Sequence, residues 1–287
     1  MTGQGPVRAR WADGRWHFQH GPIDLVIGVD GPQQVVAAAI EACWQAFTGV
    51  LQRLVVELPA LRSAWTPELA LHGPVSARMG RACAPYVHHF GLFITPMAAV
   101  AGAVADHLIV TLRGHGIERA YINNGGDIAL HLTAGTSFDV GVVADAHAAD
   151  LDGALHIDAT RPVRGVATSG WRGRSFSLGI ADSVTVLAVD AAAADAAATL
   201  IANAVDIAHR AIERAPADSL RDDTDLGARL VTVGVPALPV ADVERALDNG
   251  LAFARRCHDH GLIHAALLTL QGRTRMLNPH IAEVALT

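Results

Sequence analysis

The sequence contains no lysine, so all 22 of its basic residues are arginine. This absence excludes a phosphate-binding-loop lysine, a Schiff-base lysine and a lysine general base. Aromatic residues make up only 5% of the chain, and the formal net charge is −6. Both values disfavour a base-stacking platform and a basic nucleic-acid surface, so we expect no nucleic-acid partner.

Cysteine is also scarce. Cys43, Cys83 and Cys257 are scattered, and no two of them have the spacing of a metal knuckle. A disulfide framework is therefore not expected, and the reducing cytoplasm is the predicted compartment. The N-terminal region has no apolar stretch of signal-peptide length. The most apolar segment, 91–105, is shorter than the roughly 20 residues of a spanning helix. We expect no membrane association.

Hydrophobic residues make up 51% of the 287 residues, mostly as Ala, Val and Leu. No internal repeat or clear linker divides the chain, and we predict a single domain over 1–287. Apolar spacing of three and four predicts helices at 33–57, 97–114, 191–205 (continuing to 215) and 240–258. Short apolar runs between turn residues predict strands at 15–20, 23–29, 119–122, 128–132, 138–143, 154–158, 163–167, 183–189, 262–270 and 273–277. Residues 63–81 and 216–227 are predicted connections. This pattern predicts a mixed α/β (α+β) structure.

The first candidate site is the run Asn-Asn-Gly-Gly-Asp at 123–127, between two predicted strands. Gly125 and Gly126 permit positive φ and close approach of a ligand, while Asn124 and Asp127 supply polar side chains. An ordinary hairpin turn is the alternative, and the spacing alone favours it. The run is not a dinucleotide fingerprint, because the Gly-x-Gly-x-x-Gly spacing is missing.

The second candidate is the segment 161–174, where four arginines surround Thr168, Ser169 and Gly170. Hydroxyl groups, the backbone N–H groups of a glycine turn and guanidinium groups together suit an anion or a phosphate. An exposed arginine-rich loop is an equally good interpretation. A serine nucleophile elbow is excluded, because Ser169 lacks glycine two residues away on either side.

The third candidate is the pair Asp195 and Thr199 in the alanine-rich helix. Residues four apart share one face of a helix, and a carboxylate beside a hydroxyl suits Mg²⁺. The alternative is a core helix with one solvated carboxylate. The histidines at 88–89 and 258–260 have no strong metal signature. The second group lies at a predicted helix end, where the helix dipole favours histidine.

These three elements occur together and in a recognisable order. Asn-Asn-Gly-Gly-Asp-Ile, then Ala-Thr-Ser-Gly, then Ser-Val-Thr-Val with Ala-Asp-x-x-x-Thr resembles the ApbE-like superfamily, whose characterised members are FAD:protein FMN transferases. Further stretches are similar to an uncharacterised branch of that superfamily; they include Gly-Pro-Ile-Asp-Leu-Val at 21–26 and Ala-Thr-Leu-Ile-Ala-Asn-Ala-Val at 198–205. The resemblance covers about residues 14–275.

The resemblance implies an ApbE-like α/β fold, with mixed, largely antiparallel sheets packed with long helices. It also implies that FAD lies in a cleft and that Mg²⁺ bridges its pyrophosphate. The metal ligands carried over are Asp195 and Thr199. Two groups of residues would border the nucleotide, the Asn-Gly-Gly-Asp corner and the Thr-Ser-Gly turn: Asn124, Gly125, Gly126, Asp127, Thr168, Ser169 and Gly170.

Two departures from the transferases fall near the implied site. The interval 171–182 lacks their histidine and proline, and Ala101 occupies the position of their helix lysine. We therefore favour a protein that binds FAD, FMN or a related ring ligand with Mg²⁺, with no catalytic residue assigned. The alternative is a Mg²⁺-dependent FAD:protein FMN transferase acting on an acceptor protein. The apolar, charge-poor composition is compatible with a homodimer.

Overall fold

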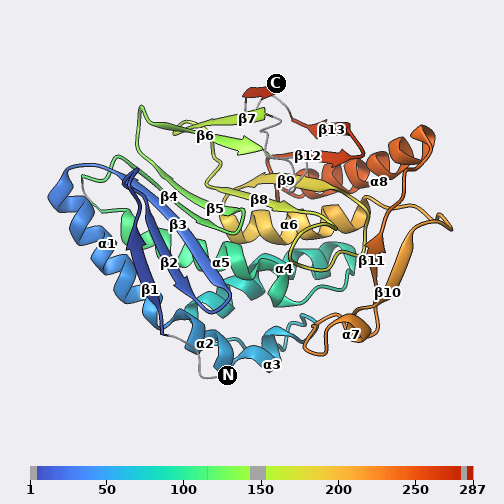
Figure 1. Ribbon diagram of the computed structural model, residues 1–287, viewed down its shortest axis with the longest axis horizontal. Coiled ribbons are helices and arrows are strands. Elements are labelled where there is room, and N and C mark those ends of the chain that lie inside the picture. Colours follow the sequence, from blue (N-terminus) through green and yellow to red (C-terminus); the bar gives the residue numbers. More distant parts are fainter. Residues whose placement is uncertain (1–4, 115, 143–152, 279–282, 287) are drawn as a thin grey trace. The chain divides into compact units, whose positions relative to one another are not determined.

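The computed structural model describes residues 5–114, 116–142, 153–278 and 283–286 (Figure 1). Internal contacts divide the chain into two compact units, and each is described by itself. The first comprises Met1–Ser137, Asp158–Ala167 and Val189–Asp195, and the second Phe138–Ile157, Thr168–Ala188 and Ala196–Thr287. The fold class predicted from the sequence, mixed α/β with largely antiparallel sheets, is confirmed. The single domain stays a prediction.

The first unit is built on an antiparallel sheet with the strand order β1-β2-β3-β4-β5-β8. In β3, Leu25 and Ile27 are fully buried, whereas Asp24 and Val26 between and beside them are partly exposed. This period of two shows that one face of the sheet carries the core. The strands are β1 (Val7–Arg10), β2 (Trp16–His20), β3 (Ile23–Asp30), β4 (Arg119–Asn124), β5 (Asp127–Leu132) and the start of β8 (Gly165–Ser169).

Helices α1 and α5 of the first unit lie along this sheet (Figure 1). The predicted helix 33–57 is interrupted at Gly49, and the predicted helix 97–114 is an α-helix with 3₁₀ turns at both ends. The helical elements are α1 (Gln33–Thr48), α2 (Val50–Val56), α3 (Leu58–Leu61), α4 (Pro74–Phe90), η1 (Pro96–Ala99), α5 (Val100–Ile109) and η2 (Val110–Leu112).

The stretch Gln33–Val56 is, by length and composition, apolar enough to cross a membrane. Its α1 part buries Ile40, Cys43 and Phe47, and its α2 part buries Val50 and Leu54. A core helix of a soluble protein passes the same test, so the finding is weak evidence for a span.

Helix α4 corrects the predicted connection over 63–81. Pro74 lies in the first turn, where a missing N–H costs nothing, and Gly91 ends the helix with φ 63°. The Glu57 carboxylate accepts the backbone N–H groups of His72 and Gly73 at 2.8 and 2.7 Å. Pro74 therefore marks the start of a helix, and Glu57 holds the chain just before it.

The second unit has an antiparallel sheet in which β12 pairs with β9 and with β13, and α8 packs along β12 and β13 (Figure 1). A second sheet has the strand order β14-β7-β6, and β10 pairs with β11. The elements are β6 (Ser137–Val142), β7 (Gly153–Asp158), β9 (Ser183–Ala188), α6 (Ala191–Ala204), β10 (Glu213–Pro216), α7 (Ala217–Leu220), β11 (Leu230–Gly234), α8 (Val240–Asp259), β12 (Ala265–Leu270), β13 (Arg273–Leu277) and β14 (Glu283–Leu286). Strand β8 changes unit after Ala167, and α6 changes unit after Asp195.

Two predictions in this region need correction. Helix α6 ends at Ala204 and does not continue to 215, because Glu213–Pro216 forms the strand β10. The predicted loop 216–227 contains the short helix α7. Val143, the last residue of the predicted strand 138–143, lies outside the described residues.

Candidate functional site

The Asn-Gly-Gly-Asp corner is a tight hairpin turn between β4 and β5. Asn124 pairs with Asp127 across the turn, and Gly125 and Gly126 have φ of 67° and 114°. Positive φ at both central positions is what two-residue hairpin turns require. The Asn123 carboxamide oxygen accepts the Gly126 N–H at 2.8 Å. The turn interpretation is confirmed, and a ligand role for the same residues stays a prediction.

The corner is tied to helix α5 by the side chain of Asn124. This side chain is buried, and its Nδ2 donates to the Ala101 carbonyl oxygen at 3.1 Å. The next residue, Gly102, donates its backbone N–H to Asp195 Oδ2 at 3.0 Å. Two consecutive residues of α5 therefore connect the corner to the predicted metal ligand on α6.

Asp195 is an acidic residue in an apolar helix, and its carboxylate accepts the Gly102 N–H. Burial raises its pKa well above the ordinary value, and the nearby Asp127 carboxylate raises it further. The backbone N–H groups of Gly102 and Ala101 act in the opposite direction, because they stabilise the ionised form. The first unit thus holds two mutually repelling carboxylates, which a bound cation would stabilise.

The first turn of α6 is held by two further carboxylates. Asp106, which is 3% exposed, accepts the N–H groups of Ala191 and Ala192 at 3.1 and 2.8 Å. Asp190 accepts the N–H of Ala193 at 2.8 Å. Burial, and then the charge of Asp190, raise the pKa of Asp106 to about 6. The N–H groups of this helix end are therefore occupied by the chain itself.

Two glycines allow the backbone at the start of α6 to pack very closely. A Cβ at Gly102 would lie 2.2 Å from the Ala191 carbonyl oxygen, and a Cβ at Gly165 would lie 2.0 Å from the Asp190 carbonyl group. Neither position has room for a side chain. Helix α5 and strand β8 thus fix the path of the chain just before Asp195.

Three polar residues at intervals of four run along α6: Asp195, Thr199 and Asn203. All three are partly exposed, whereas the alanines at 196–198 are buried. The predicted shared face of Asp195 and Thr199 is therefore present in the helix. Asp195 belongs to the first unit, and Thr199 and Asn203 belong to the second.

The predicted Thr-Ser-Gly turn is corrected: Thr168 and Ser169 are the last residues of β8, and Gly170 follows them in the second unit. The Thr168 and Thr185 hydroxyl oxygens lie 2.9 Å apart, and Ser169 is partly exposed. A Cβ at Gly170 would lie 2.2 Å from the Asp182 carbonyl oxygen, so this position requires glycine. The described residues place these three predicted ligand contacts in the second unit.

The segment 171–182, which differs from the transferase pattern, is fixed at its ends and in its middle. Asp182 accepts the Trp171 indole N–H at 3.2 Å and the Gln271 backbone N–H at 2.6 Å. The Asn203 carboxamide oxygen accepts the Leu178 N–H at 2.8 Å. The third polar residue of α6 therefore orders this segment.

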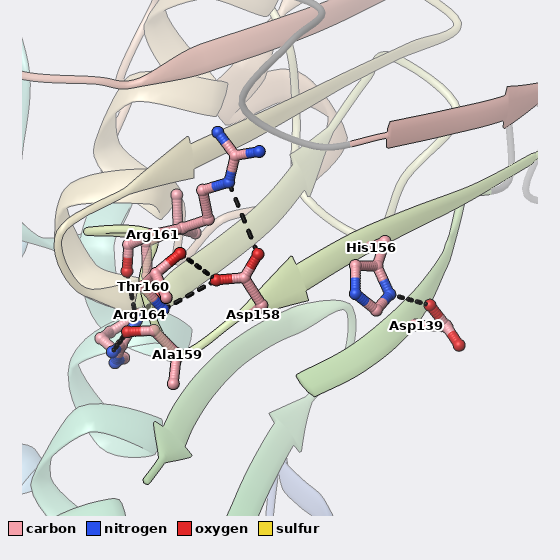
Figure 2. Close-up of polar contacts among 8 residues, drawn as sticks. Asp139, His156, Asp158, Ala159, Thr160, Arg161 and Arg164 are labelled. Carbon is pink, nitrogen blue, oxygen red and sulfur yellow. Dashed lines mark hydrogen bonds and ion pairs between the residues drawn. The ribbon is translucent and has the colours of Figure 1, made fainter. Parts of the chain in front are cut away.

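The arginine-rich segment is largely satisfied by its own chain. Figure 2 shows Asp158 Oδ1 accepting from Thr160, and the Arg161 guanidinium lies 3.6 Å from Asp158 Oδ2. Arg172 lies 3.6 Å from Asp182. These contacts favour a structural role over an anion site for much of the segment. Arg164 donates to three backbone carbonyl oxygens, at 2.6 to 2.9 Å, those of Ala159, Arg161 and Val163.

Two of the histidines make local pairs. In the second unit, His156 Nδ1 lies 2.7 Å from Asp139 Oδ1 (Figure 2), and His258 Nε2 lies 2.7 Å from Asn278 Nδ2. Within the described ranges, no group of three or more His, Cys, Asp or Glu side chains is arranged to hold a metal ion. Protein ligands alone therefore do not complete a metal site there.

Sequence reasoning missed Asp106 and the Ala101–Gly102 backbone groups. Asp106 is the only carboxylate in the apolar run 91–112, and an acidic residue in such a run is seldom buried without a partner. That signal was available in the sequence. Its partners were not, because Ala191 lies 85 positions further along the chain.

Comparison with known families shows which family this chain belongs to. A family model described as "AbpE bacteria" matches residues 8–276. The chain belongs to this family. The AbpE family assignment confirms the resemblance stated above. Similar relatives include a UPF0280 protein of Methanothermobacter thermautotrophicus, 33% identical over 67% of this chain and 76% of the relative. A UPF0280 protein of Methanopyrus kandleri is 38% identical over 67% of this chain and 75% of the relative.

Solved structures similar to this AbpE-family chain include two flavin transferases. The flavinyl transferase ApbE of Pseudomonas stutzeri has 14% identity and a TM-score of 0.44, over 97% of this chain and 96% of that chain. The flavin transferase ApbE of Vibrio cholerae has 14% identity and a TM-score of 0.42, over 96% and 97%.

Proposed function

We propose that this AbpE-family protein binds a flavin nucleotide, FAD or FMN, or a related ring ligand, with Mg²⁺ at the ligand's phosphates. The observation that carries the proposal is the carboxylate pair of Asp195 and Asp127. Asp195 lies on an otherwise alanine-rich helix, and burial, followed by the Asp127 charge, raises its pKa. The repulsion between the two carboxylates disfavours their ionised forms, and a bound cation would offset that repulsion.

The donor set fits Mg²⁺ better than a softer metal. Asp195 and Thr199 offer hard oxygen atoms one helical turn apart, and Mg²⁺ typically takes few protein ligands and completes its shell with phosphate oxygens and water. The N–H of Gly102 fixes the orientation of the Asp195 carboxylate. When bound, Mg²⁺ would neutralise the negative charge of a diphosphate and polarise its bonds.

Binding without a defined reaction is favoured over flavin transfer by Ala101. Its carbonyl oxygen accepts from Asn124, but its methyl group offers neither a proton nor a charge where the related transferases carry lysine. The proposal therefore assigns no catalytic residue. The corner residues and Thr168, Ser169 and Gly170 remain the proposed contacts of the nucleotide, and the cytoplasm remains the proposed compartment.

The test is a titration of the purified full-length chain with FAD, followed by fluorescence, with and without Mg²⁺. We expect Mg²⁺ to increase FAD affinity by tenfold or more, and Asp195→Asn to abolish that increase. Asp30→Asn is the matched control, because Asp30 is an exposed carboxylate of the same unit that pairs with Arg119. Equal FAD affinity with and without Mg²⁺ in the wild type would overturn the metal part of the proposal, and no flavin binding would overturn all of it.

A second assay separates binding from transfer. The protein is incubated with FAD, Mg²⁺ and a flavinylation acceptor, and the acceptor is examined by mass spectrometry. We expect no covalently attached FMN, because the lysine and histidine positions of the transferases are not retained. Attached FMN that disappears in Asp195→Asn would establish the alternative, a Mg²⁺-dependent FAD:protein FMN transferase with an acceptor protein as partner.

A further inference from the structure

We propose that Asp106 is a positioning residue for the metal site: it holds the first turn of α6 on α5 and so sets the location of Asp195. This inference rests on the proposed function, because it concerns how the Mg²⁺ ligand is held. Asp106 itself does not contact the metal or the nucleotide in this proposal. It acts through the backbone of Ala191 and Ala192.

The contacts form two steps of a ladder between α5 and α6. At one step, the Asp106 carboxylate accepts the N–H groups of Ala191 and Ala192. At the other, the Gly102 N–H donates to Asp195 Oδ2. Gly102 and Asp106 are four residues apart on α5, and Ala191 and Asp195 are four residues apart on α6. One helical turn separates the two steps on each helix.

The surroundings leave little freedom at this joint. Gly102 meets the Ala191 carbonyl so closely that a methyl group would collide with it, and Asp106 is almost fully buried. Loss of the Asp106 carboxylate leaves two buried helix N–H groups without their acceptor. This costs folding free energy unless α6 shifts toward another acceptor. A shift of the first turn would displace Asp195, which lies one turn later.

The charged groups near Asp106 also contribute to holding the first turn of α6. Asp190 caps the N–H of Ala193 on the same turn, and the Arg78 guanidinium of α4 lies 3.9 Å from Asp190. Two carboxylates thus hold the start of α6: Asp106 on α5, and Asp190, the residue just before α6. Asp190 lies on the chain that enters α6, whereas Asp106 ties this turn to α5 by hydrogen bonds.

A purely structural cap is the competing explanation, and Glu57 supplies the matched control. Glu57 also accepts two backbone N–H groups beside a helix, but these belong to His72 and Gly73, just before α4, and not to the first turn of α6. Asp106→Asn and Glu57→Gln each replace a carboxylate that accepts two backbone N–H groups by its amide. Both are expected to lower stability, but only Asp106→Asn should affect the metal site.

The experiment has a ligand-free measurement and a binding measurement. Hydrogen exchange of the Gly102 amide should become at least tenfold faster in Asp106→Asn and remain unchanged in Glu57→Gln, relative to the change at amides of β3 in the same variant. The factor by which Mg²⁺ increases FAD affinity should fall about tenfold in Asp106→Asn only. Asp106→Ser, whose short hydroxyl cannot accept both N–H groups, should also accelerate Gly102 exchange and serves if the amide variant does not fold.

The outcomes distinguish this inference from the proposed function. If wild-type FAD affinity does not respond to Mg²⁺, the proposed function fails, while Gly102 exchange still tests the link from Asp106 to Asp195. If Gly102 exchange and the Mg²⁺ factor are the same in Asp106→Asn and Glu57→Gln, Asp106 is only a structural cap and the inference is overturned.

Discussion

Asp195 and Asp106 are two acidic residues in apolar helices, and their surroundings suit them to different roles. Asp195 receives N–H groups from α5, so its carboxylate is oriented. Asp106 is buried, and both of its oxygens are occupied by the start of α6. The first is suited to binding and the second to positioning.

Asp106 also predicts a dependence of stability on pH. Its pKa in the folded protein is raised to about 6 by burial and by Asp190, whereas the ordinary value is 3.8. Between these values the folded state holds a proton that the unfolded chain has released. Its contribution to stability is therefore greatest below pH 4 and is lost as the pH rises through 6. The loss amounts to at most about 3 kcal/mol.

The measurement is the free energy of urea unfolding at a series of pH values from 4 to 7. We expect the wild type to lose stability relative to Asp106→Asn as the pH rises across this window. Glu57→Gln should give the opposite trend, because the pKa of Glu57 is lowered by its hydrogen bonds. A wild-type minus Asp106→Asn difference that is constant with pH would contradict the raised pKa.

At the scale of elements, α5, α6 and β8 are fitted to one another by glycine. Gly165 lies in β8 where a Cβ would be 2.0 Å from the Asp190 carbonyl and 2.3 Å from the Ala191 nitrogen. These neighbours are backbone atoms, which cannot rotate away as a side chain does. The start of α6 is therefore set from one side by α5 and from another by β8.

Gly165→Ala is expected to destabilise the protein by about 1–3 kcal/mol, because the added methyl group forces backbone atoms apart. Gly114→Ala is the control: a Cβ there meets nothing within 4 Å, and its φ lies outside the positive range. Its effect should stay within about 0.5 kcal/mol. Urea unfolding of both variants tests this prediction. Equal unfolding midpoints would contradict it and would show that the backbone of β8 shifts enough to accommodate the added methyl group.

The elements also show what the sequence could and could not reveal. Alternation in β3 and apolar spacing in α8 predicted those elements closely, because each buries one face. Helix α4 was missed because Pro74 was taken as a residue of a connection, while the chain just before the helix is held by Glu57, distant in sequence. The alanine-rich run carried no stop signal, so α6 was extended too far.

The candidate site was predictable to the extent that it depends on local spacing. Both local features can be read within a few residues of sequence: the four-residue interval of Asp195 and Thr199, and the glycine pair of the hairpin. The support of Asp195 by Gly102 and Asp106 depends on backbone groups brought together by tertiary packing, 93 and 85 positions apart. No local pattern encodes those contacts.

At the scale of the whole molecule, the chain passes between its two units several times. The first unit is assembled from three separate stretches of sequence, and the second from three others. Strand β8 and helix α6 each supply residues to both units. Neither unit is therefore a continuous piece of chain that could complete its own elements without the other.

This connectivity predicts one cooperative unfolding transition, as the single domain inferred from the sequence requires. A helix that belongs to both units cannot unfold in one and persist unchanged in the other, because helix formation is cooperative along the chain. Differential scanning calorimetry of the full chain should give one peak, with a van't Hoff enthalpy equal to the calorimetric enthalpy. Asp106→Asn should lower the temperature of that peak without splitting it. Two resolved peaks would instead identify two domains. If Asp106→Asn then shifted only one of the two peaks, that peak would belong to the unit that contains the start of α6.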